Sequence, residues 1–220
     1  MPRLRCHWAL LAHARAALLD SDSSLAALLR DHRAEFYAGG VAPDALRIFH
    51  GADKASTHFY DDQRRETWPH VVASLTAAHP VVADPTALGP SSRAWMAGYV
   101  AHIAADVAYW DNILPHLPPF PQRAPLHHGA WLIADDVAIP DGERDVDPDG
   151  VDYAAAPPWV DESAVRRMLA RLRGRILVDG MWTVELAYVR ARPEAAGKSD
   201  DELLAEHLPG WEVGLAEARQ

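Results

Sequence analysis

The sequence predicts an all-α protein, a multi-helix bundle around a core that holds a polar site. Two observations carry this prediction. Apolar residues recur at spacings of three and four almost throughout the chain of 220 residues. Helix start and stop signals bound most of these stretches. No internal repeat is found, so we expect a single domain over residues 1–220, interrupted by an acidic loop rich in Pro and Asp at about residues 140–160.

The clearest helix is predicted between Ser91 and Pro115. Pro90 and the two serines after it are typical of a helix start, and Pro115 of a helix end. One stripe of this helix carries residues spaced by three and four, and two of them are polar. The stripe consists of Trp95, Tyr99, His102, Asp106, Tyr109 and Ile113.

The first part of the chain also reads as helical. We expect a helix over Leu4–Leu19 and a second over Ser24–Ala38, which stops at Gly39 and Gly40 because glycine is the usual residue just past a helix end. The segment Val41–Asp44 is then expected to form a turn, from which a short helix could begin.

Further helices follow on either side of the long one. Thr67 with Pro69 at the first helical position indicates a helix through about Ala78. Residues 114–125 carry five prolines and cannot form a regular helix.

The last third contains three more predicted helices. They span His127–Ile139, residues 161–192 and residues 199–207, the last opened by a capping box. Gly174 and Gly180 weaken the middle one, so a kink or break is expected near Gly180.

Composition limits the function. Acidic residues outnumber basic ones by 31 to 21, a formal net charge of -10, which argues against a binder of duplex nucleic acid. Cys6 is the only cysteine, so a metal site would have to use His, Asp and Glu, and the chain has twelve histidines. No apolar run approaches the roughly 20 residues of a transmembrane segment. The N-terminal stretch reads as an amphipathic helix and not a signal peptide, so we expect a cytoplasmic protein.

Two charged segments lie near the predicted acidic loop. Asp145, Asp147 and Asp149 begin like a calcium-binding loop, but Ala156 stands where the pattern needs Glu, so a solvated loop is the better interpretation. A run of arginines over residues 166–175 is interpreted as a solvent-exposed helix face.

Five polar residues stand out in apolar or turn-forming surroundings. His102 and Asp106 are one helical turn apart and point the same way, as two ligands of one metal ion must. His7, Asp44 and His58 complete a set of three imidazoles and two carboxylates that suits zinc. The alternative is a polar pair that satisfies itself within a helical core.

The order and spacing of these residues resemble a known family. His7, the segment GGVAPD, His58 fourteen residues after Asp44, and GYVAHIAAD together look like the zinc-dependent phospholipase C family, which shares its fold with single-strand-specific zinc nucleases. The resemblance covers about residues 1–110. It implies an all-α fold whose helices converge on zinc ions that hydrolyse phosphate esters.

The resemblance also implies roles. Asp44, His58, His102 and Asp106 would hold the first zinc. Asp106 would bridge to another ion that also takes His7, and Asp44 would be a candidate base for the attacking water.

Departures from the family concern a second metal. Secreted members use an N-terminal Trp as a ligand, whereas Trp8 is internal; Asn112 stands where the family tends to place a His, and its later HxxxE pair is absent. Candidate replacements are His116, His127, His128, Asp111 and Asp136. The sequence is therefore compatible with one, two or three zinc ions per chain.

The expected function is a phospholipase C-like hydrolase of phosphoric esters that uses metal-activated water. Its substrate would be a phospholipid or a small phosphoester. Two alternatives stay open: a metal-binding or interaction scaffold of the same fold without this activity, and a zinc nuclease or phosphodiesterase.

Overall fold

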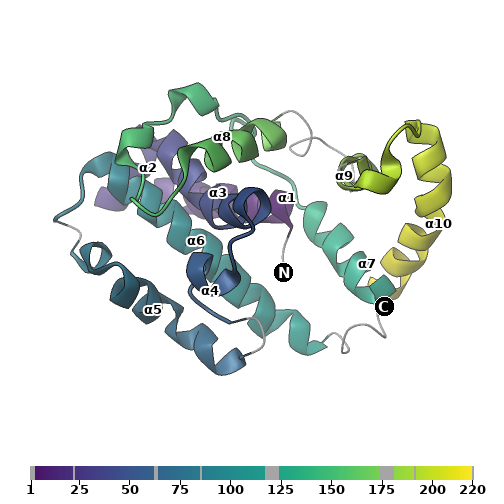
Figure 1. The fold of residues 1–220 in the computed structure, drawn as a ribbon, viewed down its shortest axis with the longest axis horizontal. Coiled ribbons are helices and arrows are strands. Elements are labelled where there is room, and N and C mark those ends of the chain that lie inside the picture. Colours follow the sequence, from purple (N-terminus) through teal and green to yellow (C-terminus); the bar gives the residue numbers. More distant parts are fainter. Residues whose placement is uncertain are drawn as a thin grey trace.

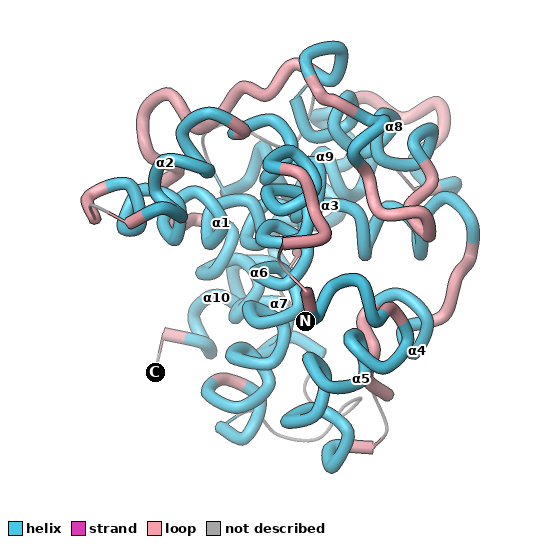
Figure 2. Tube along the Cα trace, turned by 90° about the vertical axis from the view of Figure 1, so that its left-hand side faces the viewer, coloured by secondary structure: helices cyan, strands magenta, loops and turns pink. Residues whose placement is uncertain are grey.

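The structure is a computed structural model that describes residues 3–21, 23–61, 64–84, 86–116, 124–173, 181–190 and 192–219. Within these ranges every regular element is a helix, which confirms the predicted all-α class (Figure 2). The α-helices are α1 (Leu4–Leu19), α2 (Ser24–Asp31), α3 (Arg33–His50), α4 (Lys54–Thr57), α5 (Val71–Ala78), α6 (Pro90–Asn112), α7 (Ala124–Asp135), α8 (Glu162–Arg171), α9 (Met181–Arg190) and α10 (Asp200–Ala218). Short 3-10 helices lie between them, among them Arg65–His70 and Leu114–His116.

Helices α3 and α6 form the centre of the fold and pack against each other more extensively than any other pair along the described chain (Figure 1). Glycines make this close approach possible. A Cβ atom at Gly98 would lie 1.8 Å from the Phe36 carbonyl oxygen, and one at Gly39 would lie 2.0 Å from the Trp95 carbonyl oxygen. Only residues without a side chain fit at these two contacts.

The main core surrounds this pair. Helices α1 and α8 pack on α3, and α1 also contacts α6. Large buried side chains fill the space between them; Trp8 stacks on Tyr37 with ring centroids 4.3 Å apart, and Trp95 and Tyr99 of α6 are completely buried. Burying an aromatic side chain removes roughly 150–250 Å² from water, so these residues account for much of the packing energy.

A second, smaller hydrophobic cluster joins α7, α9 and α10, which lie together at one end of the molecule (Figure 1). Its buried members include Leu132 of α7, Val189 of α9 and Leu203 and Trp211 of α10. Helix α7 also contacts α1, which connects the two clusters. A single domain over residues 1–220 stays a prediction.

The predicted helix end at Gly39 and Gly40 is wrong, and so is the turn at Val41–Asp44. Helix α3 runs through both segments and through Pro43 to His50. Every residue from Glu35 to Leu46 is buried, so packing on all sides overrides the local stop signals. The glycines serve the contact with α6 instead of a turn.

The bounds of other helices also differ from the predicted ones. Thr67 and Pro69 lie in a 3-10 helix, and α5 begins at Val71. Helix α7 spans Ala124–Asp135 where we predicted His127–Ile139. Helix α10 opens with the predicted capping box between Ser199 and Glu202 but continues through Pro209 to Ala218. The predicted kink near Gly180 lies outside the described residues.

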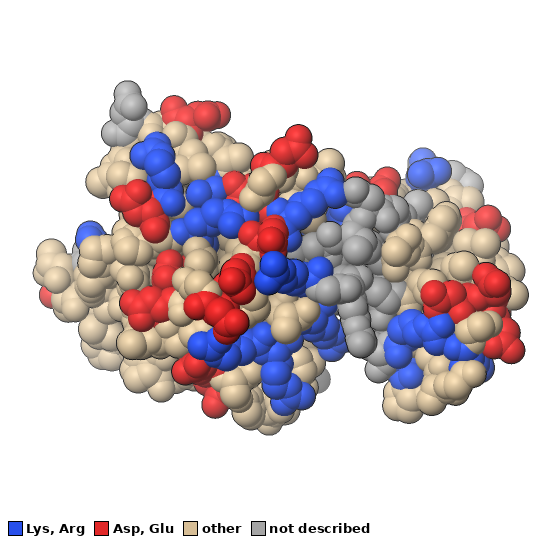
Figure 3. Space-filling model, turned by 90° about the horizontal axis from the view of Figure 1, so that it is seen from above, with Lys and Arg blue, Asp and Glu red and all other residues tan. Residues whose placement is uncertain are grey.

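The acidic loop and the basic run of α8 neutralise each other. Arg166 pairs with Asp149 at 2.8 Å, and just beyond the helix Arg173 pairs with Asp145 at 2.8 Å and with Asp147 at 3.4 Å. Acidic and basic groups accordingly intermingle over the face drawn in Figure 3. The three aspartates that resemble a calcium loop therefore already have guanidinium partners.

The glycine contact gives a first prediction. Gly98→Ala should lower the free energy of unfolding by about 1–3 kcal/mol, because the new methyl group overpacks the contact with α3. It should also weaken metal binding, since α3 and α6 both carry candidate ligands. Gly210→Ala is the control, because nothing lies within 4 Å of the added Cβ. Chemical denaturation measures the free energy of unfolding of both variants. Equal stability of Gly98→Ala and Gly210→Ala would contradict the close approach of α3 and α6.

Candidate metal centre

The two polar residues of the α6 stripe are completely buried. His102 and Asp106 are both 0% exposed, one turn apart on the face of α6 that points into the protein. Burial of a carboxylate in an apolar core is unfavourable unless cations or hydrogen-bond donors compensate it. The surroundings of these two side chains therefore decide what the site can do.

Three other elements bring further ligand-type side chains to the same place. His7 comes from α1, Asp44 from α3, and His58 follows α4; none of the three is more than 5% exposed. Ligand atoms fall into two overlapping groups, each within 4.8 Å: His7, Asp44 and His102, and His58, His102 and Asp106.

Distances within this cluster suit a small cation. The Nε2 atoms of His58 and His102 are 3.3 Å apart, and His58 Nε2 lies 3.6 Å from both Asp44 Oδ1 and Asp106 Oδ2. Two ligands bound to one tetrahedral zinc at about 2.0–2.1 Å are separated by roughly 3.3 Å. Small adjustments would therefore place these atoms around a single ion.

Hydrogen bonds set the tautomers of both imidazoles. His102 Nδ1 lies 2.7 Å from the Gly40 carbonyl oxygen, which can only accept, so Nδ1 carries the proton. His58 Nδ1 lies 2.8 Å from the Thr57 hydroxyl, whose own hydrogen goes to the Asp53 carbonyl. Both rings then turn an unprotonated Nε2 toward the cluster, the orientation that metal-ligating histidines usually have.

Asp106 is held by a second pair of side chains. The Tyr60 hydroxyl donates to Asp106 Oδ2 at 2.6 Å, and the Lys54 ammonium lies 3.7 Å from the same oxygen. Lys54 also donates to the Tyr60 hydroxyl at 2.8 Å, and both residues are buried. This arrangement fixes the carboxylate and leaves Oδ1 facing His7, whose Nε2 is 3.1 Å away.

The backbone after His58 is strained. Phe59 has φ of 60°, in the left-handed region that residues other than glycine rarely adopt. This conformation sends His58 and Tyr60 inward on either side of a buried Phe59. Such strain persists where the surrounding structure enforces it, often at functional sites.

The charge states also suit a cation. Burial opposes ionisation of Asp44 and Asp106, but the neighbouring imidazoles outweigh it and hold the pKa of both carboxyls well below its usual range. Burial, followed by the His7 imidazole, lowers the pKa of His102 to about 3. At neutral pH the cluster therefore presents ionised carboxylates and a neutral His102.

Buried polar atoms at His7 complete the test of fit. His7 Nε2 and Asp106 Oδ1 are buried and contact each other at 3.1 Å without the geometry of a hydrogen bond, and His7 Nδ1 is buried without a hydrogen bond. A buried polar atom without a partner costs roughly 1–3 kcal/mol. A divalent cation bound to the unprotonated nitrogen of His7 and to Asp106 Oδ1 would satisfy these two atoms, so the donor set fits zinc.

One side of the cluster lies nearest to solvent. Asp44 is its least buried member, and the partly exposed Arg47, one turn further along α3, lies 3.5 Å from Asp44 Oδ1. A positive charge therefore stands at the edge of the cluster.

Residues 6–170 match the zinc dependent phospholipase C family. The chain belongs to this family. The match includes all five residues of the cluster and extends beyond the resemblance over residues 1–110. No curated protein and no solved structure matches the chain.

This match confirms the family predicted from the sequence. The zinc dependence of that family agrees with the His and Asp ligand groups described above. Along the described helices, none is both long and apolar enough to pass through a membrane.

The candidates for a second metal lie elsewhere. His116 is exposed, and His128 lies 3.0 Å from Glu185 of α9; neither belongs to the two groups of ligand atoms. The side chain of His127 lies outside the described residues. Asp111 and Asp136 are exposed, as is Asn112 at the family's histidine position.

Sequence reasoning missed the residues that support the cluster: Lys54, Tyr60, Thr57 and the Gly40 carbonyl. A lysine and a tyrosine six residues apart carry no motif. The only available signal was their proximity to His58 in the sequence.

The cluster predicts which histidine holds a metal. His102→Ala should lower zinc affinity by more than about 100-fold, because even loss of a residue that merely orients a ligand typically costs 10–100-fold. His70→Ala is the matched control, since His70 is exposed at the end of a 3-10 helix. Competition against a zinc-binding dye measures both affinities. Equal affinities would make the cluster a purely structural polar core.

Proposed function

We propose that the protein is a zinc-dependent hydrolase of phosphoric esters, with a phospholipid or a smaller phosphodiester as substrate. One observation carries the proposal: His58 and His102 direct unprotonated Nε2 atoms at each other and at two ionised carboxylates. Four acceptors that converge on one place favour a cation, and family membership favours zinc.

His7, Asp44, His58, His102 and Asp106 would hold the metal. When bound, zinc acts as a Lewis acid and lowers the pKa of a coordinated water from about 16 to about 7. Both carboxylates contribute negative charge that keeps the ion in place, and Lys54 and Tyr60 keep Asp106 ionised and oriented.

Asp44 and Arg47 have roles at the solvent side. Asp44 would accept a hydrogen bond from the attacking water and orient it; its lowered pKa favours this role over long-term storage of a proton. The Arg47 guanidinium, beside Asp44, would bind a phosphoryl oxygen and align the ester with the water.

We infer that the cluster holds one ion. His102 belongs to both groups of ligand atoms, and its imidazole has a single free lone pair, at Nε2, once Nδ1 donates to Gly40. Two metal ions, one in each group, cannot both be bound by the same His102 nitrogen. The Lys54 ammonium beside Asp106 further disfavours a second cation at that carboxylate.

A second candidate function is a metal-binding scaffold without hydrolytic activity. The completely buried state of His58, His102 and Asp106 favours it, because a substrate must reach the ion. A nuclease of long polymers is disfavoured by the net charge of -10. Activity measurements therefore separate the first two functions.

The one-ion inference is tested by counting metal. Protein dialysed against a small excess of zinc and then freed of loosely bound ions should contain one zinc per chain by elemental mass spectrometry. Substitution of the exposed His70 or of His207 by Ala should leave this count unchanged. Two or more tightly bound ions per chain would contradict the sharing of His102.

Hydrolysis of an activated phosphodiester tests the function itself. Activity should rise from about pH 5 toward neutrality, since acid protonates histidine ligands and displaces the metal. A chelator should abolish activity and zinc should restore it. Asp44→Asn should lower kcat by at least about tenfold, judged in samples of equal zinc content, while Asp111→Asn on the exposed face of α6 should not. A zinc-loaded protein that hydrolyses no phosphoester would favour the scaffold.

A further inference from the structure

One face of the protein exposes many large apolar side chains. Among the described residues nine large hydrophobic side chains are exposed, and six of them line grooves beside the outer side of α6. These six are Leu10, Leu25, Val72, Ile113, Ile133 and Val137. Monomeric proteins rarely expose so much contiguous apolar surface, so this face is a candidate interaction surface.

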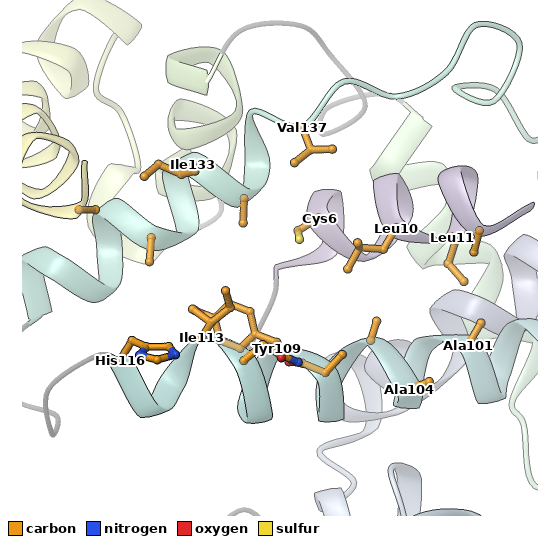
Figure 4. Close-up of a pocket in the computed structure, with 17 residues that line it drawn as sticks. Cys6, Leu10, Leu11, Ala101, Ala104, Tyr109, Ile113, His116, Ile133 and Val137 are labelled. Carbon is orange, nitrogen blue, oxygen red and sulfur yellow. The ribbon is translucent and has the colours of Figure 1, made fainter. Parts of the chain in front are cut away.

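The grooves flank α6 on both sides. One groove, of about 850 Å³, lies between α6, α1 and α7, and Leu10 and Ile133 face α6 across it (Figure 4). Another, of about 410 Å³, lies between α6 and α5 and is lined by Val72. Both grooves reach Ala104 and Ala108 of α6, so the outer side of this helix forms a low ridge between them.

The ridge carries a regular seam of residues at alternating spacings of four and three, none of which is buried. The seam consists of Arg93, Ala97, Val100, Ala104, Val107 and Asp111. This spacing is that of the contact positions of two helices that pack along their length. One turn takes 3.6 residues, so the seam lies on the side of α6 opposite the stripe of His102 and Asp106.

The seam begins and ends with opposite charges. Arg93 is its first residue and Asp111 its last, and both side chains are exposed. Neither side chain forms an ion pair or a hydrogen bond with any described residue. By contrast, Arg166 and Arg173 pair with the acidic loop. The two charges at the ends of the seam are therefore available to a partner.

The seam is complementary to itself when it is reversed. A second copy of the chain, related by a two-fold axis through the middle of the seam, would run antiparallel to the first. The facing pairs are then Arg93 with the partner's Asp111, Ala97 with the partner's Val107, and Val100 with the partner's Ala104. Each pair joins either opposite charges or a smaller and a larger apolar side chain, and symmetry repeats each pair twice.

A membrane surface suits this face less well. The metal cluster lies on the opposite side of α6, so a membrane bound here would be remote from the proposed site of hydrolysis. The net charge of -10 also opposes approach to anionic lipids. Charge complementarity along the seam favours a second copy of the chain.

We propose that the outer face of α6 is the interface of a symmetric, antiparallel homodimer, closed at both ends by an ion pair between Arg93 and the partner's Asp111. The inference does not depend on the proposed function, because the interface lies on the side of α6 away from the candidate ligands.

The oligomeric state tests the interface. Sedimentation velocity at increasing concentrations of wild type should show a reversible dimer. Ala104→Glu should raise its dissociation constant at least about 100-fold, because two carboxylates would be buried near the two-fold axis without partners. Ala205→Glu, on the exposed side of α10, is the matched control and should change the dissociation constant less than about twofold. Both replaced residues are exposed, and circular dichroism verifies that both variants fold.

Charge reversal tests the antiparallel register. Arg93→Asp and Asp111→Arg should each raise the dissociation constant about tenfold, because each change places like charges opposite one another at both ends of the interface. The variant with both changes restores opposite charges and should return to within about threefold of wild type. Failure of this rescue would overturn the proposal.

Two further results would also overturn it. The first is a wild type that stays monomeric up to about 100 µM, or a dimer that Ala104→Glu leaves intact. The second is binding of a monomeric wild type to phosphatidylcholine vesicles that Ala104→Glu abolishes and Ala205→Glu does not. That result would assign the outer face of α6 to a membrane.

Discussion

The structure depends on an array of acceptors that face one another in the core. His58 Nε2 and His102 Nε2 lie 3.3 Å apart, because Thr57 and Gly40 occupy the opposite nitrogens of the two rings. Two ionised carboxylates, Asp44 and Asp106, approach the same point. Lys54 lies beside Asp106 and Arg47 beside Asp44. A cation bound among the four groups would in addition remove their mutual repulsion.

Packing of the helices holds this array together. Gly98 lets α6 lie against the Phe36 backbone of α3, and the same contact brings the Gly40 carbonyl within reach of His102. Asp44 stands one turn further along α3, beside Arg47. The positive φ of Phe59 then directs His58 into the cluster. A change at the contact between α3 and α6 should therefore affect both the stability of the fold and the proposed metal site.

Sequence patterns predicted the helical class and brought forward the five residues of the cluster, since His102 and Asp106 form a local pair and the order of the others resembles a family. Sequence patterns did not predict features that depend on tertiary packing. Gly39 and Pro43 signal a helix end, yet burial of both keeps α3 continuous. Lys54 and Tyr60 could not be found, because their contact with Asp106 spans 46 residues or more and exists only in the fold.

The most direct measurement is the free energy of unfolding as a function of free zinc. A ligand that binds only the folded chain stabilises it by RT ln(1 + [L]/Kd), so one site raises stability by about 1.4 kcal/mol for each tenfold increase in zinc above Kd. The structure predicts this slope, and its loss when His58 and His102 are both replaced by Ala. Stability that does not change between chelator and saturating zinc would contradict the account.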